Sequence, residues 1–261
     1  MRVFLTGAEG MIGSHLKTFL ESTGWEVDTF VGDITSEEDW ASHAADGILD
    51  SEENRYDFMI HLAALAGVRA SIEEPQLYFD NNVNGTRLAL EWADVFCKKI
   101  LYASSSNAWE WWGNPYATTK MMNEIQAEQY NAIGMRFHTV WPGRDDMLYR
   151  MLERGEVEYI NENHTRDFIH IDDLCSAIHI IMHNFTHLRK TKGKAVDIGT
   201  GHSTLVKSVA KVMGFEGQYR SENPGGERVH TRADVEYLHD LGWGPKRNIL
   251  VNTGKNVIQF K

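Results

Sequence analysis

Residues 2–13 read RVFLTGAEGMIG, a short apolar run followed at once by Gly7, Gly10 and Gly13. The run predicts a buried strand, and residues 11–22 are typical of a helix. In such a strand–loop–helix unit the first glycine permits the tight turn and the second lets the backbone approach a pyrophosphate. The third lets helix and strand pack closely, and the helix N-terminus stabilises the anion. The stretch therefore predicts a dinucleotide-binding loop, against the alternative of an ordinary glycine-containing turn.

The strand–helix alternation continues along the chain. We expect strands over 25–31, 57–63, 99–104, 134–141 and 195–198, and helices near 36–46, 75–97, 115–133, 172–185, 203–213 and 232–241. This order predicts an α/β protein with a Rossmann-type doubly wound parallel sheet. Because the pattern becomes less regular after about residue 142, we expect 1–142 to be mainly the NAD-binding domain. Residues 143–261 would then be mainly a small substrate-binding annex, with segments that the sheet takes up.

Composition narrows the classes of partner. The 261-residue chain carries a net charge of −11, which disfavours nucleic acid and anionic membranes as partners.

The two cysteines of the chain, Cys97 and Cys175, are far apart in the sequence, which fits a reducing cytoplasm. No apolar run reaches transmembrane length, and the first residues predict a strand rather than a signal peptide. The twelve histidines occur without a metal-binding spacing, so we expect no metal site.

The region after the second predicted strand should supply an acidic group for the adenosine ribose of the cofactor. Asp28 lies within that strand, and Asp33 follows it, next to Ile34. Asp33 could lie near the adenosine or cap the next helix. Neighbouring residues include no arginine or lysine to pair with a 2′-phosphate, which favours NAD and leaves NADP open.

Two further segments indicate proton-transfer chemistry. Tyr116 and Lys120 form YxxxK, which places both side chains on one face of a helix. A neighbouring ammonium favours the phenolate, so Tyr116 could accept a proton near neutral pH. The serines 104–106 end a strand, where α/β sheets bind ligands, and Ser106 could share a proton with Tyr116 and a substrate hydroxyl. The alternatives are a helix start with an exposed lysine and a polar turn that caps the strand.

These motifs resemble the extended short-chain dehydrogenase/reductases, the NAD-dependent epimerase/dehydratase family. The resemblance runs along nearly the whole chain, through MRVFLTGAEGMIGSHL, HLAALAGVRASIEEP, DNNVNGT, YASSS, PYATTK and RDFIHIDDL. Within the family, AGVRASIEEP, YASSS, GRDDM and TRDFIHIDDL are most similar to UDP-glucuronate 4-epimerases, with UDP-galactose (UDP-glucose) 4-epimerases next.

The resemblance implies an NAD-dependent sugar-nucleotide 4-epimerase that works through a transient 4-keto sugar. Its substrates would be UDP-glucuronate and UDP-galacturonate, or UDP-glucose and UDP-galactose. Tyr116 would remove the proton of the sugar 4-hydroxyl while hydride passes from C4 to NAD, and hydride would return to the other face. Lys120 would bind the nicotinamide ribose and lower the tyrosine pKa, and Ser106 would orient the hydroxyl.

The expected binding residues fall into two sets. Cofactor-binding residues are expected at Gly7, Gly10, Met11, Ile12, Gly13, Asp33, Ile34, Leu62, Ala63, Ala64, Asn82, Ser104, Tyr116, Lys120 and Phe137. Substrate-binding residues are expected at Arg69, Ser105, Ser106, Thr139, Arg144 and Arg166. By resemblance, Arg166 pairs with the diphosphate and Arg144 lies near a sugar carboxylate, which arginine binds in bidentate fashion. The alternative for Arg144 is a surface pair with Asp145 or Asp146.

The chain departs from the family pattern on the substrate side. The short stretch before Tyr116 carries Trp109, Trp111 and Trp112, which either form a substrate wall or fill a core left by the shortened loop. A dehydratase would need acidic groups where Asn107 and Ala108 stand, and a 4-keto reductase would prefer NADPH. A non-catalytic dinucleotide-binding regulator would not need the tyrosine. The resemblance also implies a homodimer, paired through the YxxxK helix and the long helix before it.

Overall fold

The computed structural model describes residues 1–44, 52–192, 195–221 and 226–251, so residues 45 and 46 of one expected helix lie outside it. The chain forms two compact units, residues 1–136 with 184–196, and residues 137–183 with 197–261. A six-stranded sheet has the order β2-β1-β3-β4-β5-β9. Its strands are β1 (Arg2–Thr6), β2 (Glu26–Thr29), β3 (Phe58–His61), β4 (Ile100–Ser105), β5 (Ala132–Phe137) and β9 (Ala195–Ile198).

The sheet has a doubly wound parallel topology, as predicted. β1 pairs in parallel with both β2 and β3, and β3 pairs in parallel with β4. The strand order therefore reverses between β1 and β3. This reversal is the switch point at which open α/β sheets bind ligands, and the glycine loop follows β1 at that point.

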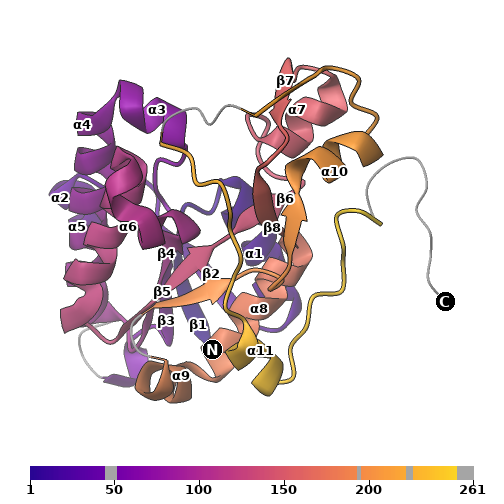
Figure 1. The fold of residues 1–261 in the computed structure, drawn as a ribbon. Coiled ribbons are helices and arrows are strands. Elements are labelled where there is room, and N and C mark those ends of the chain that lie inside the picture. Colours follow the sequence, from indigo (N-terminus) through magenta and orange to yellow (C-terminus); the bar gives the residue numbers. More distant parts are fainter. Residues whose placement is uncertain (45–51, 193–194, 222–225, 252–261) are drawn as a thin grey trace. The chain divides into compact units, whose positions relative to one another are not determined.

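Helices cover both faces of the first unit's strands. Helices α2, α5 and α6 lie on one face, and α1 lies on the other (Figure 1). The helical segments of this unit are α1 (Met11–Ser22), α2 (Glu37–Ser42), η2 (Glu52–Asn54), α3 (Val68–Glu73), α4 (Pro75–Tyr78), the π-helical η3 (Phe79–Asn84), α5 (Gly85–Phe96), the 3₁₀ segment η4 (Ser106–Gly113), α6 (Pro115–Gln126), η5 (Ala127–Gln129) and α9 (Phe185–Thr191).

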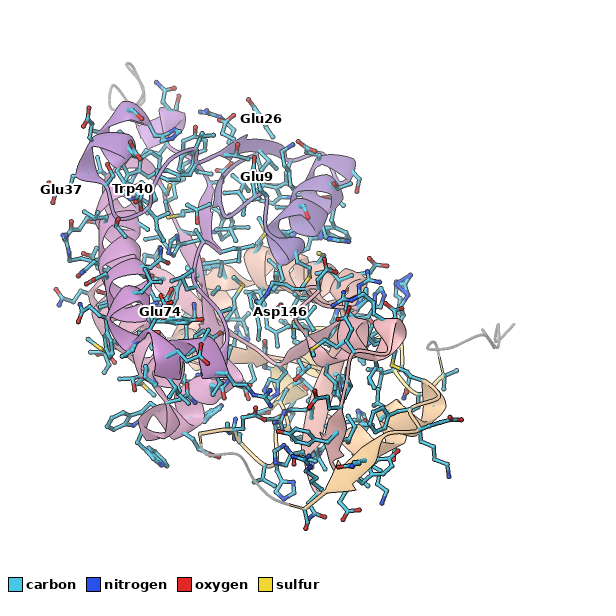
Figure 2. The ribbon with its side chains drawn as sticks, turned by 90° about the horizontal axis from the view of Figure 1, so that it is seen from above. Glu9, Glu26, Glu37, Trp40, Glu74 and Asp146 are labelled. Carbon is cyan, nitrogen blue, oxygen red and sulfur yellow. The ribbon has the colours of Figure 1, made fainter. Side chains whose placement is uncertain are left out.

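An aromatic core joins the sheet to α2 and α5. Phe4 of β1 stacks on Trp92 of α5 with ring centres 4.4 Å apart, and Phe30 lies 4.2 Å from Trp40 of α2. Trp40 points inward from α2, whereas Glu37 of the same helix points into solvent (Figure 2). Burial of large aromatic rings contributes most of the packing energy of such a layer, so this face is firmly held.

The second unit is built around a small mixed sheet. β8 (Thr165–His170) pairs in parallel with β6 (Thr139–Trp141) and antiparallel with β10 (Ser203–Leu205). Its other elements are α7 (Leu148–Arg154), β7 (Tyr159–Asn161), α8 (Ile171–His183), α10 (Val206–Val212), β11 (Gln218–Arg220) and α11 (Glu236–Asp240). Buried Asp167 accepts hydrogen bonds from the Thr200 hydroxyl and from the amides of Thr200, Gly201 and Ala233, which ties three segments together.

Several predicted elements differ from the structure. The helix expected over 115–133 ends at Gln126, because the chain must extend to pair Ala132 and its neighbours into the sheet. The strand expected over 134–141 is divided at His138 into β5 and β6, which belong to different sheets. The helix expected over 203–213 starts at Val206, because residues 203–205 pair with β8.

Candidate active site

The glycine loop is folded tightly over the N-terminus of α1. The Gly10 amide donates to the Gly7 carbonyl at 3.0 Å, and Gly10 is the N-terminal capping residue of α1. A Cβ on Gly13 would lie 2.0 Å from that carbonyl oxygen, and one on Gly7 would lie 2.7 Å from the Ala63 amide nitrogen. No side chain caps α1, and its first turn holds no acidic residue. The positive end of the helix is therefore suited to a pyrophosphate, as NAD requires.

The acidic residues after the glycine loop have distinct roles. The Asp28 carboxylate accepts a hydrogen bond from the Tyr56 hydroxyl at 2.8 Å, so it is engaged in a contact inside the first unit. Asp33 is exposed, and its Oδ1 accepts from the amide and the hydroxyl of Thr35, which lowers the pKa of Asp33. Ser36, rather than Asp33, caps α2, so the capping interpretation of Asp33 is wrong. Asp33 thus stays a proposed ligand of the adenosine.

Asn82 fixes the segment that follows β3. Its Oδ1 accepts from the Leu65 amide at 2.8 Å, and its Nδ2 donates to the Leu65 carbonyl and to the Thr119 hydroxyl. Asn82 lies in the π-helical segment η3, a distortion that is often found at functional sites. Through these bonds it holds the segment that contains the expected cofactor contacts Leu62, Ala63 and Ala64 against α6.

Tyr116 and Lys120 lie one turn apart on α6. Asn114 caps the helix, and Pro115 occupies its first position. Lys120 Nζ lies 5.8 Å from the centre of the Tyr116 ring and donates to the Ala103 carbonyl of β4 at 2.9 Å. The Lys120 side chain is 2% exposed, so the interpretation as an exposed lysine is wrong. Burial lowers the pKa of Lys120 to about 8, so near neutral pH its ammonium remains mostly charged close to the phenol.

The serine triplet contacts the same helix. The Ser104 hydroxyl donates to Glu124 Oε1 at 2.6 Å, and the guanidinium of Arg136 donates to both carboxylate oxygens of Glu124. Lys120 and Glu124 therefore bind consecutive residues of β4 from positions one helical turn apart. Glu124 was not predicted as a site residue from the sequence, although its spacing of four from Lys120 places it on the same face.

Ser105 and Ser106 begin the segment that leads to the tyrosine. The Ser105 hydroxyl accepts from the Asn107 amide at 3.2 Å and caps η4. Ser106 is the first residue of η4 and is buried. The strand therefore delivers Ser106 to the carboxyl edge of the sheet, the edge at which its hydroxyl is expected to act.

The tryptophans of η4 do not fill a core. Trp109, Trp111 and Trp112 are 52%, 46% and 69% exposed, so the core-filling interpretation is wrong. Trp109 lies over the Arg136 guanidinium at 4.1 Å, and the rings of Trp111 and Trp112 meet edge to face. Their use as a substrate wall stays a prediction.

His61, at the end of β3, is fully buried between two hydroxyls. Its Nδ1 lies 2.8 Å from Thr6 Oγ1, and its Nε2 lies 3.2 Å from Thr86 Oγ1. Burial, aided by the positive charge of Lys120, lowers the pKa of His61 to about 3. The ring is therefore neutral across the physiological range.

The neutral state of His61 predicts a specific acid sensitivity. Between pH 6.5, the ordinary histidine pKa, and about 3, the unfolded chain binds a proton at residue 61 that the folded protein does not. Stability should therefore fall with decreasing pH, by about 1.4 kcal/mol per pH unit from this residue alone. Urea unfolding of the wild type and of His61→Gln between pH 6 and 4 measures the difference in slope. Equal slopes would contradict a neutral His61 in the folded state.

Two expected substrate arginines lie in the second unit. Arg166 of β8 donates to the Val229 carbonyl, and Glu227 Oε2 lies 3.8 Å from its guanidinium. Arg144 makes a bidentate pair with Asp146 at 3.0 and 2.9 Å, as the surface-pair alternative predicted. Both cations therefore have a carboxylate beside them in this structure.

The remaining expected contacts lie apart in the chain. Arg69 is an exposed residue of α3 in the first unit. Phe137 and Thr139 lie in the second unit, at the end of β5 and the start of β6. Within the described ranges there is no cluster of metal-ligand side chains and no helix that could span a membrane.

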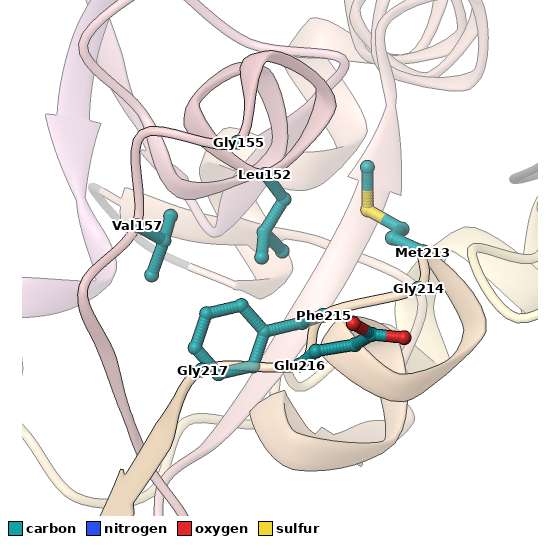
Figure 3. Close-up of a pocket in the computed structure, with 8 residues that line it drawn as sticks. All are labelled: Leu152, Gly155, Val157, Met213, Gly214, Phe215, Glu216 and Gly217. Atoms are coloured by element: carbon teal, nitrogen blue, oxygen red, sulfur yellow. The ribbon is translucent and has the colours of Figure 1, made fainter.

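A pocket of about 180 Å³ in the second unit has no group of side chains suited to binding NAD or to acid–base catalysis. Leu152, Val157, Met213 and Phe215 line it together with Glu216 and three glycines, and the apolar side chains face one another across it (Figure 3). None of the expected site residues lines this pocket. It offers no cation for a phosphate and no acid–base pair, so we place the chemistry at the glycine loop and α6.

The parallel sheet, the glycine loop at its switch point and the Tyr116–Lys120 pair define a Rossmann-type NAD-binding enzyme of the extended short-chain dehydrogenase/reductase kind. The model of the NAD dependent epimerase/dehydratase family matches residues 3–199. The chain therefore belongs to the NAD-dependent epimerase/dehydratase family, and its cofactor is NAD.

Individual relatives are similar over most of their length. A putative UDP-glucose 4-epimerase of Methanocaldococcus jannaschii is 26% identical, over 94% of this chain and 93% of the relative. A probable UDP-glucuronate 4-epimerase of Rhizobium meliloti is 30% identical, over 70% of this chain and 68% of the relative. The structure of MoeE5 in complex with UDP-glucose and NAD superposes with a TM-score of 0.77 at 27% identity, over 96% of this chain and 95% of that one.

Proposed function

We propose that the protein is an NAD-dependent sugar-nucleotide 4-epimerase. The observation that carries the proposal is the buried ammonium of Lys120, one turn from Tyr116 and hydrogen-bonded to the strand that leads to Ser106. Binding of NAD alone would not require an ionisable phenol beside a buried cation. Relatives named as UDP-glucose and UDP-glucuronate 4-epimerases support a UDP sugar as the substrate.

The chain's own residues would handle the proton of the reaction. Bound NAD supplies the acceptor and donor of hydride. The Tyr116 phenolate would take the proton of the sugar 4-hydroxyl and later return it to the same oxygen, so no net proton is consumed. The Lys120 ammonium would stabilise the phenolate, and the Ser106 hydroxyl would hold the sugar oxygen in line with the tyrosine.

Substrate choice would depend on the second unit. We propose that Arg166 binds the diphosphate, for which its partly buried guanidinium is suited. Arg144 could bind a sugar carboxylate only if its ion pair with Asp146 breaks and the carboxylate replaces Asp146 as its partner. A UDP-glucuronate 4-epimerase therefore needs that exchange, whereas a UDP-glucose 4-epimerase does not.

Incubation of the purified protein with NAD and four UDP sugars tests the proposal. The sugars are the glucose, galactose, glucuronate and galacturonate forms, and chromatography separates each pair of 4-epimers. We expect interconversion within one pair. Loss of water from the sugar would instead indicate a dehydratase. A separate incubation with NADPH and a 4-keto sugar nucleotide would reveal a 4-keto reductase by reduction of that sugar. NAD binding with no conversion of any sugar nucleotide would favour a non-catalytic regulator.

We also propose a cytoplasmic homodimer that pairs through α5 and α6. Apolar side chains on both helices are exposed, with Val95 of α5 47% exposed and Ile125 of α6 61% exposed. Exposed apolar side chains that form a contiguous patch across adjacent helices are typical of an interface. Sedimentation velocity distinguishes a dimer from a monomer.

A further inference from the structure

A buried row of polar side chains crosses the first unit from the glycine loop to the catalytic helix. Thr6 of β1 contacts His61 of β3, His61 contacts Thr86 of α5, and Asn123 of α6 donates to the Thr86 hydroxyl at 3.0 Å. All four residues are at most 3% exposed. They come from four separate elements, and no sequence motif links them.

The first end of the row lies at the cofactor loop. Thr6 directly precedes Gly7, and its hydroxyl oxygen accepts from the Ala63 amide at 3.2 Å. Because Gly7 itself packs against the Ala63 backbone, this bond and the bond from the Leu62 amide to the Thr6 carbonyl at 3.3 Å set the spacing between the two segments that meet at the switch point. A shift of Thr6 would therefore move the glycine loop and the 62–64 segment relative to each other.

The second end lies on the helix that carries the acid–base pair. Asn123 is a neighbour of Lys120 in α6, and Thr119 in the same turn receives a hydrogen bond from Asn82. α6 is thus linked by buried hydrogen bonds to α5 and to η3, as well as to β4. The row therefore connects the glycine loop, where the pyrophosphate is expected, to the helix that carries Lys120, the expected contact of the nicotinamide ribose.

The imidazole suits the middle of this row chemically. A neutral imidazole has one donor and one acceptor nitrogen, and each flanking hydroxyl can both donate and accept. Both ring nitrogens are therefore satisfied whichever of them carries the proton. A protonated ring would add a second cation near the ammonium of Lys120, so the neutral form is the one that is compatible with the site.

We propose that His61 is a positioning residue for NAD, because through Thr6, Thr86 and Asn123 it holds the glycine loop in register with the catalytic helix. It does not touch the reacting atoms. Its contribution is to keep the two ends of the cofactor site at the separation that bound NAD requires. A buried polar row rigidifies its surroundings only when every member is paired, which is the case at both ring nitrogens.

The test removes the Thr86 hydroxyl without changing the shape of the side chain. Thr86→Val keeps the volume of the side chain but deprives His61 Nε2 and Asn123 Nδ2 of their shared partner. We expect it to weaken NAD binding roughly tenfold or more, on the scale of a lost buried hydrogen bond. Thr86→Ser restores the hydroxyl and should recover most of the affinity. NAD binding is measured by calorimetry at a temperature at which circular dichroism shows every variant folded.

A matched variant separates positioning from general stability. Thr231→Val removes a buried hydroxyl that accepts from the Asp167 amide in the second unit, so it should lower the melting temperature without changing NAD affinity. If Thr86→Val behaves in the same way, or if Thr86→Ser fails to rescue binding, the positioning role is refuted. Should Thr86→Val not fold, Asn123→Ala breaks the neighbouring link and carries the same expectation. The assay needs no sugar, so its outcome is independent of the proposed epimerase activity.

Discussion

Replacement of Tyr116 by phenylalanine is expected to slow epimerisation by about 10²- to 10⁴-fold, the range that a positioned general acid–base contributes. The phenylalanine ring keeps the packing of Tyr116 against Tyr78, whose ring centre lies 6.3 Å away. Only the phenol oxygen is removed, so NAD affinity should fall far less than the rate, although Tyr116 is also an expected cofactor contact. The measurement is the initial rate of 4-epimer formation on the sugar nucleotide that the panel identifies, together with calorimetric binding of NAD.

Tyr102→Phe is a matched control for this change. Tyr102 lies in β4 of the same unit and is fully buried, and within the described residues its hydroxyl has no hydrogen-bond partner. Its removal should leave the rate unchanged. A Tyr116→Phe protein that keeps more than a tenth of the wild-type rate would show that another group moves the proton. A parallel loss of NAD affinity would instead indicate that the phenol holds the cofactor.

The local part of this site could be predicted from the sequence. The glycine loop and YxxxK each lie within one strand–loop–helix or one helical turn, so their geometry follows from spacing. The Tyr116–Lys120 pair is on one face of α6, as expected, and the glycine loop meets α1 as expected. These features do not depend on how distant segments pair.

The C-terminal boundary of α6 could not be predicted from the sequence. Most of residues 121–129 are good helix formers, and no glycine or proline interrupts 121–133, so propensity alone continues the helix. The structure ends it at Gln126, because the amide of Ile100 bonds to the carbonyl of Asn131 and β5 must begin beside β4. Tertiary pairing, which single-sequence propensity does not contain, decides this boundary.

The buried polar contacts between distant segments could not be predicted from the sequence either. Glu124 binds Ser104 and Arg136, and Thr86 joins His61 to Asn123, but these partners lie far apart in the chain. No spacing rule links residues of four different elements. In the sequence, Trp111 and Trp112 were equally compatible with a buried core and with an exposed wall. Only the structure shows that they are exposed.

The second large effect is expected at the third glycine of the loop. In Gly13→Ala the new Cβ would lie 2.0 Å from the Gly7 carbonyl oxygen and 2.9 Å from the Ala8 Cα. Alanine favours a helix over glycine by about 1 kcal/mol, but overpacking costs about 1–3 kcal/mol and here meets only backbone atoms. Since no flexible side chain can yield, the loop must move away from α1. We expect about 10- to 100-fold weaker NAD binding, because about 1.4 kcal/mol corresponds to a tenfold change in affinity.

The same substitution at two other glycines gives a series of graded expected effects on NAD affinity. A Cβ on Gly10 would lie 3.2 Å from the same Gly7 oxygen, so Gly10→Ala should weaken NAD binding by a smaller factor. A Cβ on Gly244, in the second unit, would meet nothing within 4 Å, so Gly244→Ala should bind NAD like the wild type. Because the three changes are chemically identical, their order of affinity measures the closeness of loop to helix alone. Wild-type NAD affinity in Gly13→Ala would mean that the cofactor does not depend on this loop–helix contact.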